Sequence, residues 1–189
     1  MILEDAHRAL RSVVDGLPAD GRTRPTPCEK WNVTQVLQHA VGDQIGYAGT
    51  LTGGPMPTED PFAPSGKLEG DPAVFLDAAV RSSAAAFAAV APDAENVPTP
   101  LPQGALPASL AVGACALDAA VHAWDIAVAT GQPSPLTPAM ARALMPVATA
   151  LVEPLRQYGA YAAAIPSAAG DGEVEALLRY LGRRPDWSA

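Results

Sequence analysis

Residues 108–130 read ASLAVGACALDAAVHAWDIAVAT, and this stretch decides the fold. Apolar and small side chains occupy nearly every position, so the segment lacks the polar face that a surface helix shows. Gly131 follows directly, and glycine is a common residue just beyond a helix C-terminus. We therefore predict a helix over residues 108–130 that lies buried at the centre of a helical domain.

Further helices are predicted on both sides of this segment, because apolar residues recur at helical spacing and Pro- and Gly-rich stretches separate them. They cover residues 2–17, 32–51, 71–90, 137–158 and 172–181, with loops at 18–30, 53–70 and 92–107. Pro146 and Pro154 are expected to kink or interrupt the helix over 137–158. No alternating strand pattern is visible. The predicted fold class is all-α, with four or more helices packed side by side in one domain over residues 1–189.

The composition limits the classes of partner. The chain has 12 Lys and Arg against 20 Asp and Glu, a net charge of −8, and no cluster of basic residues. Nucleic acid and membrane surfaces are therefore not expected partners. Cys28 and Cys115 are too few for a disulfide framework. Residues 1–5 carry no feature of a secretory signal, and charged residues break the apolar stretches before they reach spanning length, so we expect a cytoplasmic protein.

Three ionisable side chains interrupt the apolar central helix. Asp118, His122 and Asp125 stand at positions i, i+4 and i+7, within about 60° of one another around the helix axis. Burying such groups is costly unless they are paired or bind a metal. His39, at the edge of the apolar face of residues 32–51, adds an imidazole from a second helix. His39, Asp118 and His122 together make a three-ligand set of the kind that catalytic zinc sites use, and Asp125 is expected to orient His122 or to stabilise the fold.

The same residues allow a metal-free interpretation. Asp118 and His122 could pair with each other or with an arginine as a satisfied buried network, and the bundle would then bind an apolar small molecule. A homodimeric structural or regulatory module is a third interpretation. Outside this set, Cys28 and Cys115 are interpreted as structural, and His7 is expected at the surface or its boundary.

Three segments resemble the signatures of one family. They are TPCEKWNV at 26–33 followed by VLQH at 36–39, then VHAWDIA at 121–127, and GRRPDW at 182–187. In this order they resemble the DinB-like superfamily, in particular the actinobacterial single-domain proteins related to the N-terminal domain of mycothiol-dependent maleylpyruvate isomerase. The resemblance covers nearly the whole chain.

The resemblance implies a DinB-like four-helix bundle with additional short helices and a divalent metal, zinc or nickel, between helices. The ligands of the isomerase fall on His39, Asp118 and His122, with Asp118 in place of a glutamate. The function implied is that of a metal-dependent thiol S-transferase or isomerase that acts on a small electrophile, with mycothiol as co-substrate. The alternative is a metal-free helical-bundle protein that binds or sequesters a small molecule. Neither interpretation identifies the catalytic or thiol-binding residues.

Overall fold

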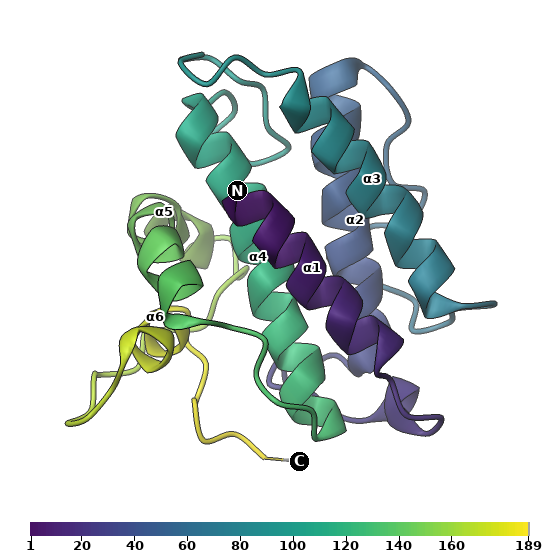
Figure 1. Cartoon of the computed structure of the whole chain (residues 1–189), viewed down its shortest axis with the longest axis vertical. Helices are drawn as coiled ribbons and strands as arrows, with labels where there is room; N and C mark the ends of the chain where they lie inside the picture. Colours follow the sequence, from purple (N-terminus) through teal and green to yellow (C-terminus); the bar gives the residue numbers. More distant parts are fainter. Residues whose placement is uncertain (189) are drawn as a thin grey trace.

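Six α-helices make up the regular structure of residues 1–188, the part of the chain that the computed structural model describes. They are α1 (Ile2–Asp15), α2 (Val33–Thr52), α3 (Pro72–Ala88), α4 (Ala108–Thr130), α5 (Pro138–Arg156) and α6 (Glu173–Tyr180), with a 3-10 turn at Gly21–Thr23 (Figure 1). The described residues contain no strand, only isolated β-bridges at Pro25–Asn32 and Val97–Leu106. The predicted all-α fold class is confirmed.

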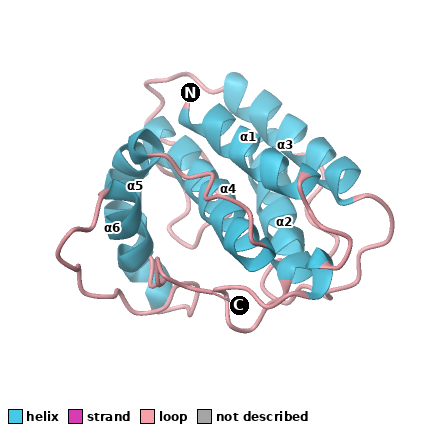
Figure 2. Ribbon diagram, turned by 60° about the horizontal axis from the view of Figure 1, so that its bottom comes forward, coloured by secondary structure: helices cyan, strands magenta, loops and turns pink. Residues whose placement is uncertain are grey.

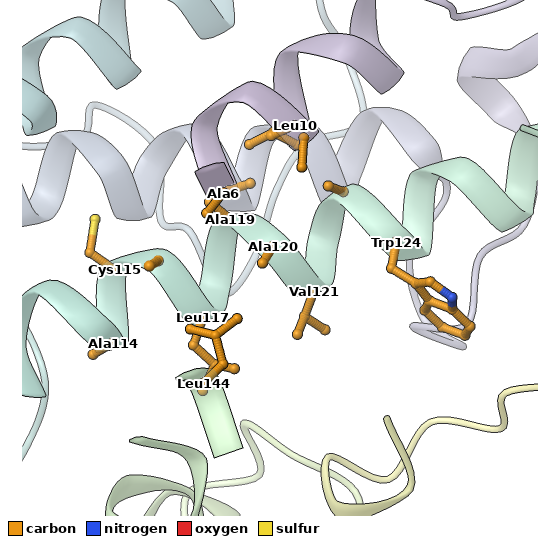
Figure 3. Close-up of a cluster of buried hydrophobic side chains, with 14 of the residues drawn as sticks. Ala6, Leu10, Ala114, Cys115, Leu117, Ala119, Ala120, Val121, Trp124 and Leu144 are labelled. Carbon is orange, nitrogen blue, oxygen red and sulfur yellow. The ribbon is translucent and has the colours of Figure 1, made fainter. Parts of the chain in front are cut away.

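The helix α4 forms the centre of the bundle, as its sequence predicts. It packs against α1, α2 and α5, while α3 covers α1 and α2, and α5 and α6 lie together on one side (Figures 1 and 2). Small side chains allow α1 to approach α4 closely, since Ala6 and Leu10 lie next to Ala119 and Ala120 (Figure 3). By length and hydropathy α4 could cross a membrane, but 89% of its most apolar window is buried inside the protein, as in the core helix of a soluble domain.

The helix α5 continues without interruption through Pro146 and Pro154. A proline has no backbone N–H, so each of the two removes one hydrogen bond of the helix. For this reason the sequence predicts a kink or break at both positions. Both prolines lie on the exposed side of α5, so water can hydrate the carbonyl groups that lose their partners. The apolar side of the helix, with Leu144, Val147 and Leu151, stays buried and holds the helix together.

A capping box at the start of α2 and a glycine in its middle position this helix and the loop that covers it. Asn32 and Gln35 form a reciprocal capping box at the start of α2, each side chain accepting from the other's backbone N–H. Farther along the same helix, Gly42 lacks a side chain where a Cβ would meet the Pro61 ring at 3.0 Å. The Pro-rich loop over residues 53–70 can therefore lie directly against α2, which brings the Pro61 carbonyl close to His39.

Candidate metal centre

Two histidines and one aspartate meet between α2 and α4. His39 extends from α2, and its Nε2 atom lies 3.4 Å from Oδ1 of Asp118 on α4. His122, one turn farther along α4, places its Nε2 atom 3.3 Å from the same oxygen. The three side chains are about nine-tenths buried, and their donor atoms lie within 4.8 Å of one another. The structure thus brings together His39, Asp118 and His122, which the sequence singles out as candidate ligands.

The far side of each imidazole ring is occupied by a hydrogen-bond acceptor. Nδ1 of His39 lies 2.8 Å from the Pro61 carbonyl oxygen, and Nδ1 of His122 lies 2.9 Å from Oδ2 of Asp125. A carbonyl and a carboxylate can only accept, so each Nδ1 carries the proton. In the neutral form of either ring, the Nε2 atom therefore directs a lone pair towards Asp118.

Two features of this arrangement fit a bound cation. Two Nε2 lone pairs and a carboxylate oxygen face one another, and the second oxygen of Asp118, Oδ2, is buried with no hydrogen-bond partner in the described part of the chain. Ligands of a tetrahedral zinc ion lie about 3.3–3.6 Å apart, since each stands about 2.0–2.2 Å from the metal. The two distances of 3.4 and 3.3 Å match this spacing, so the set could hold a divalent metal.

Without a metal, protons supply the positive charge. Burial opposes protonation of His39 and His122, but the neighbouring carboxylates outweigh it and raise the pKa of both imidazoles. Asp118 acts on both rings, Asp43 adds to the effect on His39, and Asp125 adds to the effect on His122. Burial likewise opposes ionisation of Asp118, but the two imidazoles hold the pKa of its carboxyl group below the usual range. The metal-free centre is thus a cluster of imidazolium and carboxylate groups.

Asp125 lies directly behind His122 and is held by Arg183. The guanidinium donates to both carboxylate oxygens, at 3.1 Å from Nε and 2.9 Å from Nη2, and the Asp125 side chain is fully buried. The charges of Arg183 and His122 outweigh the effect of burial and keep the pKa of Asp125 below its usual range. The Cys28 thiol also donates to Asp125, at 3.2 Å. Asp125 thus bridges Nδ1 of His122 and the guanidinium of Arg183.

The structure adds residues that the sequence analysis missed. Asp43 follows His39 by one helical turn, and its Oδ2 atom lies 4.0 Å from His39 Nε2. Burial, reinforced by the charge of Asp118, raises the pKa of Asp43 to about 7. In the sequence, Asp43 could have been identified by its four-residue spacing from His39, which equals the spacing between Asp118 and His122. The Trp31 and Phe62 rings flank His39, with ring centroids 4.8 and 5.6 Å from the imidazole.

The prediction for His7 is wrong. His7 is only 3% exposed, and its Nε2 atom lies 2.7 Å from Oε1 of Gln44 on α2. Ser83 on α3 donates to the same oxygen at 2.7 Å, and the Cys115 thiol donates to it at 3.2 Å. These contacts satisfy the polar groups, and so a histidine can occupy the apolar face of α1.

Two hollows of the described residues do not contain the candidate ligands. A hollow of about 570 Å³ lies between α1 and the start of α5, next to Arg8 and Thr137. A second, of about 130 Å³, lies under the loop over residues 53–70, next to Gln38 and Phe75. We place the candidate site at the two histidines and Asp118 because three ionisable side chains with perturbed pKa values are buried there against one another.

Comparisons with known proteins identify the family of the chain. A family model described as the mycothiol maleylpyruvate isomerase N-terminal domain matches residues 3–127, which include His39, Asp118 and His122. Two uncharacterized proteins of Mycobacterium tuberculosis, one from each of two strains, are each 32% identical to this chain over 159 residues. The aligned part covers 82% of this chain and 79% of each relative. No solved structure is significantly similar to the chain.

Proposed function

Because the chain belongs to the family of the mycothiol maleylpyruvate isomerase N-terminal domain, we propose that it is a divalent-metal-dependent enzyme that uses a low-molecular-weight thiol. The thiol is mycothiol, and the reaction is an S-transfer to, or an isomerisation of, a small electrophile. The expected partners are thus small molecules, and the net charge of −8 disfavours nucleic acid and anionic membranes. We further propose that the enzyme acts in the cytoplasm.

One observation carries the proposal: Nε2 of His39 and Nε2 of His122 lie 3.4 and 3.3 Å from Oδ1 of Asp118, while Oδ2 of Asp118 is buried without a hydrogen-bond partner among the described residues. His39, Asp118 and His122 would hold zinc or nickel. The bound cation would lower the pKa of a thiol at the remaining position, so that the sulfur is available as a thiolate at neutral pH.

The surrounding residues support this role of the ligands. The Pro61 carbonyl and the Asp125 carboxylate each accept from an imidazole Nδ1, so that Nε2 is the atom of each ring that would bind the cation once its own proton is displaced. Trp31 and Phe62 present apolar surface beside His39, and Phe62 is 67% exposed. An apolar electrophile that approaches His39 would contact this ring first.

Elemental analysis of the untagged protein tests the proposal. We expect about one zinc or nickel ion per chain in the wild type, and its loss in His39→Ala and His122→Ala. The control is His7→Gln, which changes the one histidine outside the centre and should keep the metal. Thiol-transfer assays with mycothiol and model electrophiles then follow. A protein that retains no metal after loading with zinc or nickel would contradict the proposal and favour a metal-free small-molecule-binding bundle.

A further inference from the structure

We propose that Asp43 is a further ligand of the same centre, so that the cation is held by two imidazoles and two carboxylates. This inference rests on the metal centre of the proposed function. It assigns to Asp43 a role that the three-ligand set of His39, Asp118 and His122 does not include.

The two facing helices each carry a His–Asp pair with the same spacing. On α2, Asp43 follows His39 by four residues, and on α4, His122 follows Asp118 by four residues. Side chains four residues apart lie on the same face of a helix, one above the other. Oδ2 of Asp43 lies 4.0 Å from Nε2 of His39, the atom that faces Asp118. Asp43 thus stands beside the cluster, within 4.0 Å of one of its ligands, and its carboxylate would have to move towards Asp118 to share a cation with the other three residues.

Asp43 has no other positive partner that would explain its position. Among the described residues, its only ion-pair partner is His39, whereas Asp125 of the same region is held by Arg183. A carboxylate that is mostly withdrawn from water normally has a cationic partner or binds a metal. The buried Oδ2 atom of Asp118, which has no hydrogen-bond partner among the described residues, is a separate sign that a cation belongs at this cluster.

The charge balance also favours four ligands. Neutral His39 and His122 with one carboxylate would leave a divalent cation with a net charge of +1 in a nearly buried site, which is costly in a medium of low dielectric constant. A second carboxylate makes the centre neutral. At 22% side-chain exposure, Asp43 is also the most exposed of the four residues.

Titration with cobalt(II), followed by visible absorption, tests the role of Asp43 in Asp43→Asn. We expect the dissociation constant for cobalt to rise by more than about tenfold. The absorption bands of the bound cobalt should also change in position and intensity, because these bands report the coordination number and ligand type. The matched control is Asp93→Asn, which removes an exposed carboxylate far from α2 in sequence and should bind cobalt as the wild type does. Far-UV circular dichroism of the metal-free variants checks that both are folded.

The outcomes separate this inference from the proposed function. If the wild type binds cobalt and Asp43→Asn binds it equally well, Asp43 is not a ligand and the three-ligand centre stands. Weaker binding with an unchanged spectrum would likewise overturn the inference, since Asp43 would then act from outside the coordination shell. If the wild type binds no cobalt, the proposed function itself fails.

Discussion

Arg183 and Asp125 form a buried pair of opposite charges behind the candidate centre, where the Asp125 side chain is fully buried and that of Arg183 is 10% exposed. The variant Arg183→Met would leave the carboxylate without its main partner. Because breaking a buried pair leaves an uncompensated charge, we expect a loss of about 3–5 kcal/mol in the free energy of unfolding, measured by urea denaturation. Arg184→Met, at an exposed neighbouring position, should change stability by less than about 0.5 kcal/mol. Equal losses in the two variants would show that the pair does not stabilise the fold.

His7 makes the stability of the fold sensitive to acid. Burial, with a smaller contribution from Arg11, lowers the pKa of His7 even though Gln44 accepts from its ring. In the unfolded chain the imidazole titrates near about pH 6.5. The unfolded state therefore takes up the proton first as the pH falls, and the contribution of neutral His7 is full above that value and is lost below it.

At about pH 7.5 we expect the wild type to have a larger free energy of unfolding than His7→Gln, and this difference should shrink as the pH falls to about 5.5. The measurement is the difference between their free energies of unfolding at each pH. Taking this difference cancels the titration of His39 and His122, which both proteins share. A difference that is constant over the range would mean that His7 is not neutral and buried in solution.

At single positions, the sequence predicts part of the site. The shared orientation of Asp118, His122 and Asp125 could be predicted from their spacing because one helix carries all three. The sequence also held a signal for His7, which continues the apolar stripe of Leu3 and Leu10 on α1. Arg183 reaches Asp125 across 58 residues of chain, and no periodic pattern of one element can predict such a contact.

At the level of helices, prediction was most successful where local chemistry sets the ends. The central helix has the predicted bounds, Ala108–Thr130, because Gly131 adopts the left-handed conformation there with φ of 73°. The helix α3 begins at Pro72, one residue after the predicted start, because Asp71 caps it. The helix α1 ends at Asp15, two residues early, and α3 ends at Ala88, two residues before the predicted end. The continuity of α5 depends on which face meets solvent, which the sequence of that helix alone does not determine.

The contact between α4 and α5 depends on Gly113. A Cβ at this position would lie 2.6 Å from Cγ2 of Val147, a stiff, buried side chain. Gly113→Ala should therefore destabilise the fold by about 1–3 kcal/mol, although alanine favours the helix itself. The matched control is Gly46→Ala in α2, where the nearest heavy atom is 3.8 Å away, and a gain of about 0.5–1 kcal/mol is expected. Thermal denaturation of both variants measures the difference. A stable Gly113→Ala would mean that α5 can shift away from α4 at little cost.

In the molecule as a whole, the apolar core extends well beyond the metal centre. The core of α1 to α4 is built from apolar and small side chains, so removal of the metal should lower the melting temperature without unfolding the protein. A metal at about 100 times its dissociation constant contributes about 2.7 kcal/mol, which corresponds to a shift of about 5–10 °C for a domain of this size. Calorimetry with and without a chelator measures this shift. The same chelator should leave the melting temperature of His39→Ala unchanged, and a similar shift in that variant would point to metal bound elsewhere.

The two histidines are oriented by different kinds of acceptor, and this has a consequence for how the protein can evolve. His39 is held by a main-chain carbonyl at Pro61, an atom that every amino acid possesses, whereas His122 is held by the side chain of Asp125. In a library of random substitutions, position 61 should accept any residue that preserves the path of the loop. Positions 125 and 183 should accept almost none. Lineages that change their substrate can therefore vary the loop above α2 freely, while the side of the centre formed by α4 and the C-terminal segment stays fixed.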